Sequence, residues 1–546
     1  MMRINSGDLN TNYFHGMVRT RNSRSTITSQ VAEDGRILEG IDEIGKEAVD
    51  FYKNLLGMAN SSLKHVTVGT FQKLLFHHLP EESSLCEAIF AGKITSVIKK
   101  MKRSKAPGPD GFPAEFFQDN WSLVGPVTIK AIMEFFDTGT LRREVNCTIL
   151  TLIPKVPNAG FIKYFRPISC CNFIYKCISK ILVNRLKEVL PQLISSNQTA
   201  SIKGRLITDN IILAHEMVKW YKRKNVSSRC ALKIDIMKTF DNVDWGFLVT
   251  VMLAMGLPEK GIKWVQCCLE STTFSVCING GLTGNFPAKK GLRQGCPLSP
   301  YLFAISMEVL SCMLNRATAR NVLPYQPQCL RIGLTHLCFV DDLLIFTKGS
   351  GEAVGTVATI LEKFYLVSGL RCNPSKSEFF CAGVTEEERG LLASCSRFKE
   401  GALPVRYLGI PLTAGKLKAA ECRALVERIT SRTRGWQAKL LTYADKLQLI
   451  VAVLANITQF WMNIIQLPKK VIREVESLCS KFLWGNLEQR KKAKVAWKHV
   501  ALPKEEGGLG FRDLWSWNQA CLARHIWAVL ADQETLWIAW LKEYML

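Results

Sequence analysis

The segment Thr335–Phe346 limits what this chain can fold into more than any other stretch. It reads Thr-His-Leu-Cys-Phe-Val-Asp-Asp-Leu-Leu-Ile-Phe, so Asp341 and Asp342 lie between two short apolar runs. Each run is too short for a stable helix and is rich in residues that favour strands. We therefore predict a strand, a tight turn and a second strand, with both carboxylates at the tip.

Two adjacent carboxylates between apolar runs are costly, because like charges repel and burial penalises both of them. A bound cation removes both penalties, which favours a site for a hard metal ion. The alternative is a polar hairpin tip whose acids only face water. For an isolated Asp-Asp pair that alternative would be preferred, so a second acidic strand is needed to favour the metal.

Residues Cys230–Ile236 supply that second strand. Alternation places the odd-numbered residues, Asp235 among them, on one face and Leu232, Ile234 and Ile236 on the other. Two such strands side by side in an antiparallel sheet can hold three carboxylates around a pair of Mg²⁺ ions, which prefer oxygen ligands and often take others from substrate phosphates. Two such ions about 4 Å apart support phosphoryl transfer.

The pleat of a strand sets a limit on this arrangement. Neighbouring residues point to opposite faces, so Asp341 and Asp342 cannot contribute equally unless the turn rotates one of them. We expect Asp341 to be the principal metal ligand and Asp342 to be auxiliary.

Three segments in order resemble one family. Phe339–Asp342 is similar to the aromatic-X-Asp-Asp signature of reverse transcriptases, Asp235 with Phe240 is similar to their first palm motif, and Gly291–Phe303 lies between the two. The last segment resembles the motif that holds the template and the incoming nucleotide in LINE-type (non-LTR) retrotransposon reverse transcriptases, particularly those of plants. The resemblance implies RNA-templated DNA synthesis with two Mg²⁺ ions, which Mn²⁺ could replace, held by Asp235, Asp341 and Asp342.

The resemblance also implies contacts to the incoming nucleotide. Lys155 and Arg166 are expected at the triphosphate, since Arg suits bidentate phosphate contacts and Lys supplies a point charge. Phe240 is expected beneath the sugar, where its bulk excludes a 2′-hydroxyl, although a core Phe is the plainer reading. Gln294 is expected to contact the nucleotide, and Gly295 to allow the backbone to approach it.

Two further cations are implied, and three positions depart from the family pattern. Arg205 is expected to contact a template phosphate. Lys376 is expected either to protonate the pyrophosphate leaving group or simply to neutralise phosphate charge. The departing positions are Thr239, Cys296 and Val340, where relatives more often carry Ala, Asp and Ala. At position 296 a carboxylate near the nucleotide would be lost.

The implied fold is α+β, a right hand with fingers, a palm built on a small antiparallel sheet, and a helical thumb. The expected divisions are a linker over 1–60 that follows a missing endonuclease, a helical fingers extension over 61–134, fingers and palm over 135–412, a thumb over 413–490, and the start of a truncated zinc-binding segment over 491–546.

The composition is consistent with a folded protein that binds nucleic acid. The chain has 71 Lys and Arg against 47 Asp and Glu, and this net charge of +24 attracts a polyanion such as an RNA template or a DNA primer. The 19 cysteines lack zinc-ligand spacing, so buried reduced thiols in an intracellular protein, nuclear or cytoplasmic, are expected. Residues 447–467 carry no charge but six polar side chains, which favours a buried helix over a membrane span.

Two other functions stay open at this point. A relic of an element, lacking its endonuclease and zinc segment, could bind RNA without chemistry. An intron maturase would use a related hand to fold RNA. The survival of all three acids favours residual polymerase chemistry, and the LINE-like flanks at residues 7–15 and 502–511 argue against a maturase.

Overall fold

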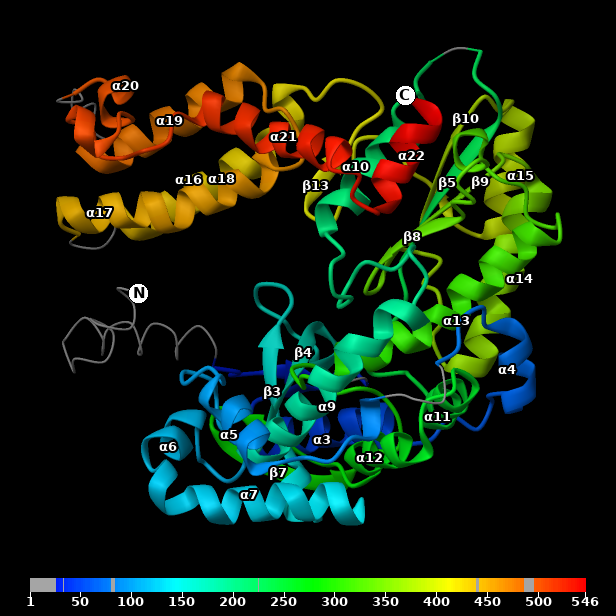
Figure 1. Ribbon diagram of the computed structural model, residues 1–546, viewed down its shortest axis with the longest axis vertical. Helices are drawn as coiled ribbons and strands as arrows, with labels where there is room; N and C mark the ends of the chain where they lie inside the picture. The colour runs from blue at the N-terminus through cyan, green and yellow to red at the C-terminus, as the bar shows by residue number, and fades with distance from the viewer. Residues whose placement is uncertain (1–25, 33, 80–83, 224, 438–440, 486–494) are drawn as a thin grey trace.

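The computed structural model describes residues 26–32, 34–79, 84–223, 225–437, 441–485 and 495–546. Helices and small sheets are mixed along the chain, as expected for an α+β protein. Figure 1 shows a helical arm at the top left, a sheet-containing group of elements at the bottom, and a central sheet at the upper right.

The central sheet has five strands in the order β11-β10-β5-β9-β8. Every neighbouring pair is antiparallel except β10 and β11. The strands are β5 (Arg229–Ile234), β8 (His336–Phe339), β9 (Asp342–Thr347), β10 (Glu378–Ala382) and β11 (Lys399–Glu400). The predicted strand, turn and strand around Asp341 and the predicted strand before Asp235 are therefore confirmed.

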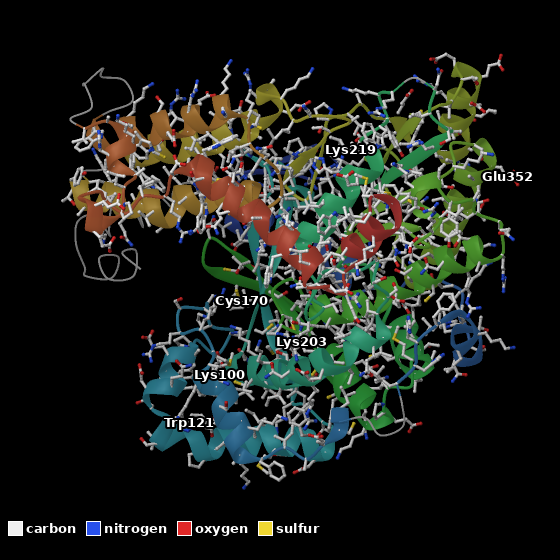
Figure 2. All side chains as sticks on the ribbon, turned by 45° about the horizontal axis from the view of Figure 1, so that its top comes forward. Lys100, Trp121, Cys170, Lys203, Lys219 and Glu352 are labelled. Carbon is white, nitrogen blue, oxygen red and sulfur yellow. The ribbon has the colours of Figure 1, made fainter. Side chains whose placement is uncertain are left out.

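Both faces of this sheet are covered, which explains its apolar sequence. Leu232 and Ile234 belong to the largest core cluster, whereas Ala231 belongs to the second, so the predicted alternation holds. The first face packs on α9 (Phe173–Leu193), α11 (Trp245–Ala254), α13 (Ser299–Ala319) and α14 (Gly351–Ser368), and the second on α10 (Ile207–Val218) and α22 (Leu536–Tyr544). In Figure 2 Glu352 of α14 lies at the outer edge of this part.

A second sheet has four strands in the order β4-β3-β6-β7. They are β3 (Cys147–Pro154), β4 (Phe165–Cys171), β6 (Thr273–Ile278) and β7 (Gly281–Pro287). Helix α3 (Ile41–Leu56) buries Ile44 and Tyr52 against it. Residues 26–56, expected as part of a linker, therefore fold onto this sheet, and the rest of the expected linker before residue 26 lies outside the described residues.

Further helices and short strands complete the lower part and the rim of the central sheet. They are β1 (Gln30–Val31), β2 (Ile37–Leu38), α4 (Val68–Leu74), α5 (Ala91–Lys99), α6 (Ala114–Asp119), α7 (Trp121–Thr138), α8 (Arg143–Asn146), α12 (Glu259–Glu270), α15 (Glu386–Ser396), β12 (Val405–Tyr407) and β13 (Ile410–Leu412). The Pro- and Gly-rich segment 105–113 forms a loop before α6, as its composition predicts.

The helical arm contains the uncharged stretch 447–467. Its helices are α16 (Arg423–Gln437), α17 (Tyr443–Leu449), a π-helical turn at Ile450–Leu454, α18 (Ala455–Met462), α19 (Lys469–Trp484), α20 (Trp497–Val500) and α21 (Leu514–Leu530). Ile450 and Leu454 are buried while Val451 is 44% exposed, so the stretch is amphipathic rather than buried all round. No helix among the described residues is long and apolar enough to cross a membrane.

The C-terminal part returns from the arm to the central sheet, where α22 lies beside α10 (Figure 1). Trp540 is 1% exposed, and its Nε1 donates to the Gln328 carbonyl at 2.9 Å. Residues 495–546 therefore join the second core cluster, where a separate zinc-binding segment was expected to begin. No disulfide joins the cysteines of the described residues; most of them are buried, whereas Cys395 is exposed.

Candidate active site

The three acids are brought together by strand register. Ile234 pairs with Leu343 and Lys233 with Leu344, so one further step places Asp235 opposite Asp342. Residues directly opposite each other in an antiparallel pair share a face of the sheet. Asp341 lies in the turn between β8 and β9, at the exposed tip of this hairpin. It accepts a hydrogen bond from Thr239 Oγ1 at 3.2 Å.

The hairpin turns at Val340, which has a φ of +55°. A β-branched residue rarely adopts this left-handed conformation, which costs roughly 1–2 kcal/mol for an L-residue. The rotation is the one that the pleat argument required, because it removes Asp341 from the regular alternation of β9. Asp342 resumes the strand and pairs with Phe339.

The site accumulates negative charge. Burial raises the pKa of Asp342, and the neighbouring charges of Asp341 and Asp235 raise it further, against the opposing effect of Lys233. Within the described residues no three His, Cys, Asp or Glu side chains converge closely enough to hold a metal ion by themselves. The carboxylates still fit Mg²⁺ in charge and ligand type, since this ion usually keeps waters and takes substrate phosphate oxygens as further ligands.

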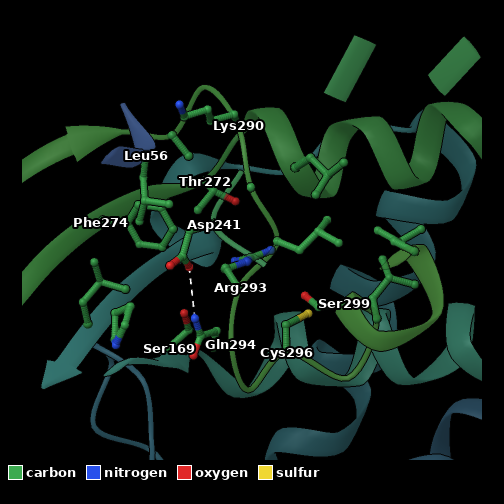
Figure 3. Close-up of a pocket in the computed structure, with 18 of the residues that line it drawn as sticks. Leu56, Ser169, Asp241, Thr272, Phe274, Lys290, Arg293, Gln294, Cys296 and Ser299 are labelled. Carbon is green, nitrogen blue, oxygen red and sulfur yellow. Dashed lines mark hydrogen bonds between the residues drawn. The ribbon is translucent and has the colours of Figure 1, made fainter. Parts of the chain in front are cut away.

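A small cavity lies between the four-stranded sheet, the loop of residues 288–298 and the start of α13, and Asp241 is among the residues that line it (Figure 3). Its volume is about 20 Å³, enough for one water molecule. Gln294 Nε2 donates to Asp241 Oδ1 at 3.0 Å across this cavity, and burial raises the pKa of Asp241. The expected nucleotide contact Gln294 is therefore held by an acid that the sequence had not singled out.

Two of the expected phosphate-binding cations, Arg166 and Lys376, lie close enough to a third, Lys155, to affect its pKa. Partial burial lowers the pKa of Lys155, and the positive charges of Arg166 and Lys376 lower it further, although Asp241 opposes them. Lys376 is exposed in the loop that precedes β10, and that loop is fixed to the site because Asp235 N donates to Ser377 Oγ at 3.1 Å. The loop, the end of β3 and β4 thus bring three cations close together, and one of them, Lys155, lies near Asp241.

Comparison with known proteins indicates the family of this region. Residues 153–412 match the family described as reverse transcriptase (RNA-dependent DNA polymerase). Over these residues, just under half of the chain, the protein is similar to a reverse transcriptase domain. The matched segment contains both acidic motifs, the glycine-rich segment and the cations Lys155, Arg166, Arg205 and Lys376.

Two of the relatives are named as proteins of mobile elements, which supports the non-LTR type. The chain is 28% identical over 513 residues to the transposon TX1 uncharacterized 149 kDa protein of Xenopus laevis, covering 92% of this chain and 38% of the relative. It is 24% identical over 438 residues to the Pol polyprotein of the type-2 retrotransposable element R2DM of Drosophila melanogaster, covering 76% and 38%.

A shorter match of 38% identity over 114 residues, 21% of this chain and 18% of the relative, is to a putative ribonuclease H protein of Arabidopsis thaliana. The chain therefore spans well under half the length of each of these three curated relatives.

Phe240 and Gly295 lie in the matched segment, and each makes a structural contact besides the nucleotide contact expected of it. The Phe240 ring is half-buried and stacks on Phe303 with centroids 5.2 Å apart. Packing and a sugar contact are both compatible with that position. Gly295 has a φ of +111°, and a Cβ there would lie 3.2 Å from the Ser169 carbonyl. Its freedom serves a close approach to β4 as well as any approach to a nucleotide.

Arg205, expected at a template phosphate, bonds to the backbone of its own segment. Its guanidinium donates to the carbonyls of Ile194, Ser195 and Gln198 at 2.5 to 2.6 Å. Burial lowers its pKa, against the opposing effect of Glu308. Both terminal nitrogens are directed at the backbone that follows α9, so the structure gives Arg205 a role in fixing this segment.

Cys296 also lies elsewhere than expected. It is 4% exposed, 3.1 Å from the Tyr175 hydroxyl, in the shell around the buried Arg293. Arg293 stacks over the Tyr175 ring at 3.9 Å and donates to Asn146 Oδ1 at 2.6 Å, but it forms no ion pair within the described residues. A carboxylate at position 296 would therefore lie near the buried Arg293 guanidinium. With Cys296 in its place, the loop lacks the ion pair that such a carboxylate could form.

Several polar residues of the site were missed. Thr239 and Asp241 carry hydrogen bonds to Asp341 and Gln294, and Gln198 and Asn210 bond to the β8 end of the hairpin. The last two lie in the same segment of the chain as Arg205, the residue there that the sequence singled out. Uncharged polar residues inside otherwise apolar elements were the sign that could have found them.

Proposed function

We propose that this chain is an RNA-directed DNA polymerase of a non-LTR retrotransposon. The observation that carries the proposal is the register that sets Asp235 beside Asp342, with Asp341 at the adjoining turn. The central sheet then corresponds to a palm, the four-stranded sheet with its helices to fingers, and the helices α16–α19 to a thumb. RNA template, DNA primer and dNTPs are the substrates.

The acids and cations divide the work of nucleotidyl transfer. Asp235 and Asp341, with Asp342 as auxiliary, would hold two Mg²⁺ ions, which activate the primer 3′-hydroxyl and stabilise the leaving oxygen when bound. Lys155 and Arg166 bind the triphosphate and orient its α-phosphate. Lys376 neutralises the pyrophosphate or gives it a proton. Catalysis then rests mostly on positioning and charge stabilisation.

The remaining contacts select the nucleotide. Gln294, released from Asp241, is placed to contact it, and Gly295 lets the loop approach. Phe240 sits where bulk beneath the sugar would favour dNTP over rNTP. The pair Gln294–Asp241 is closed at 3.0 Å in the free chain, so nucleotide binding requires that this hydrogen bond be exchanged.

Primer extension by the purified chain on a poly(rA)/oligo(dT) duplex, with Mg²⁺ and dTTP, tests this function. We expect extension by the parent and a loss of at least about a hundredfold in Asp341→Asn, because one lost ligand disrupts the metal pair. Duplex affinity should change little in that variant. Asp137→Asn, which makes the same change at an exposed position of α7, should behave like the parent.

The opposite results are equally informative. No extension by the parent, with salt-dependent binding of the duplex, would refute polymerase activity and leave a nucleic-acid-binding relic. Equal extension by the parent and by Asp341→Asn would refute the assignment of the acids.

A further inference from the structure

The turn that presents the acids is strained at one residue. Val340 has a φ of +55°, a conformation that a β-branched side chain rarely adopts. Asp341 and Asp342 follow it directly. Any relaxation of Val340 toward the β region would therefore move both carboxylates, so something must hold this residue in place.

Two buried side chains bond to both peptide groups of Val340. Gln198 Nε2 donates to Cys338 Sγ at 3.1 Å, and that thiol donates to the Val340 carbonyl at 3.3 Å. The Val340 N–H in turn donates to Gln198 Oε1 at 3.4 Å, the longest of the three. The amide, the thiol and the Val340 backbone thus form a closed ring of hydrogen bonds.

The ring is anchored by a backbone strap, residues 195–199, beside β8. Thr199 N donates to the Cys338 carbonyl at 3.1 Å, and Cys338 N donates to the Asn197 carbonyl at 2.9 Å. Gln198, between those two strap residues, is 1% exposed, and its Oε1 also accepts from Ala200 N at 3.0 Å. The orientation of its amide is therefore fixed from both sides.

The thiol is suited to this role. Burial raises the pKa of Cys338, and the charge of Asp341 raises it further, so its proton is available for donation. Thiols are weak donors and acceptors, so the Gln198 amide supplies the stronger partner. The two side chains come from segments 140 positions apart and meet only at this turn.

We propose that Gln198 and Cys338 are positioning residues that clamp Val340 in its left-handed turn and thereby place Asp341 and Asp342 for metal binding. This inference rests on the proposed polymerase function. Catalytic groups need to be held within about 0.5 Å of their productive positions, which a freely relaxing turn would not achieve.

The first experiment breaks the ring from each side. We expect Gln198→Met and Cys338→Ala each to lower the rate of single-nucleotide incorporation between about ten- and a hundredfold. The Mg²⁺ concentration for half-maximal rate should rise several-fold, with little change in duplex affinity. Cys338→Ser keeps a donor and an acceptor and should retain most of the rate. The double variant should lose no more than the worse single variant, because both act through one ring.

Gln326→Met is the matched control. Gln326 is 0% exposed, and its amide donates to the Met217 carbonyl and accepts from the Tyr221 hydroxyl, so neither bond involves the turn or the strap. It should lower the thermal midpoint without changing the Mg²⁺ requirement. A clamp role and a general loss of stability are thereby separated.

The second experiment removes the strain itself. Glycine adopts a positive φ without penalty, so in a Val340→Gly background the cost of Gln198→Met should fall at least about threefold. Hydrogen exchange of peptides covering 336–345 gives a readout without activity. Gln198→Met should speed exchange there, and Gln326→Met should not.

The outcomes separate this proposal from the polymerase function. Absence of synthesis by the parent refutes the polymerase function, while exchange at 336–345 still decides the clamp. Unchanged exchange in Gln198→Met refutes the clamp, as does an equal effect of Gln198→Met and Gln326→Met on the Mg²⁺ requirement. Undiminished cost in the Val340→Gly background also overturns it.

Discussion

At the scale of single residues, the two side chains that bond to the acid-bearing turn, Gln198 and Cys338, are buried and uncharged. Glu308 of α13 is buried too, but it is an acid. It is 1% exposed and accepts hydrogen bonds from Ser195 N and Oγ at 3.0 Å. These bonds attach the strap to α13. Burial raises the pKa of Glu308 to about 7.

The sign of the resulting pH dependence follows from that direction. Because the folded-state pKa lies above the unfolded value, the folded protein keeps a proton that the unfolded chain has released between about pH 4.5 and 7. The contribution of Glu308 to stability is therefore largest below this window and falls as the pH rises through it, by about 3 kcal/mol in all.

Glu308→Gln keeps an acceptor for Ser195 and never becomes charged. We expect the thermal midpoint of this variant relative to the parent to rise steadily from pH 5 to pH 8. Glu362→Gln, which changes an exposed acid of α14, should show no such trend. A constant difference between Glu308→Gln and the parent across the pH range would contradict the assignment.

At the scale of elements, the segment from the end of α9 to the start of α10 connects the acids to the core. Arg205 binds its carbonyls, Glu308 binds Ser195, and the strap pairs with β8. These long-range bonds give an otherwise irregular stretch a fixed shape.

Arg205→Gln distinguishes this structural role from a template contact. We expect a lower thermal midpoint, from roughly 2 kcal/mol of lost charge-assisted hydrogen bonding. The slope of log affinity against log salt for duplex binding should stay unchanged. A phosphate contact would instead reduce that slope by about one, so a smaller slope in Arg205→Gln would restore the original expectation.

The elements that the sequence predicted correctly are encoded by short, local residue patterns. The β8–β9 hairpin and β5 are each specified by a few consecutive residues, whose alternation and turn chemistry are local. The direction of the Arg205 side chain, the partners of Cys296 and the Gln198–Cys338 contact depend on segments more than a hundred positions away, or on which face of a loop is buried. Such contacts leave no periodic pattern, so only the folded structure could show them.

At the scale of the whole molecule, the C-terminal part ties the helical arm to the central sheet. Among the described residues, the second core cluster includes side chains from β9, α10, α16, α19 and α22. Local motifs could not predict this, because apolar helices pack alike in a separate domain and in an extension of an existing core. The five tryptophans between residues 515 and 540 differ in exposure, and this difference shows which side chains of the region pack into the core.

Trp540 and Trp527 test this arrangement as a pair. Trp540 is 1% exposed, stacks on Tyr544 with centroids 5.6 Å apart and bonds to the loop before β8, whereas Trp527 is 68% exposed. Trp540→Ala should cost about 3–5 kcal/mol, since a large buried ring is lost. The thermal midpoint should fall, and limited proteolysis should cut the connection between α21 and α22 sooner.

Trp527→Ala removes the same side chain from the same region and should leave both measurements near the parent values. Duplex affinity adds a third readout, because an arm released from its anchor on α10 would hold the duplex less firmly. If Trp540→Ala and Trp527→Ala behave alike, α22 is an independent appendage and the arm is held by its own contacts alone. If only Trp540→Ala opens the chain and weakens duplex binding, the C-terminal residues belong to the structure that grips the substrate.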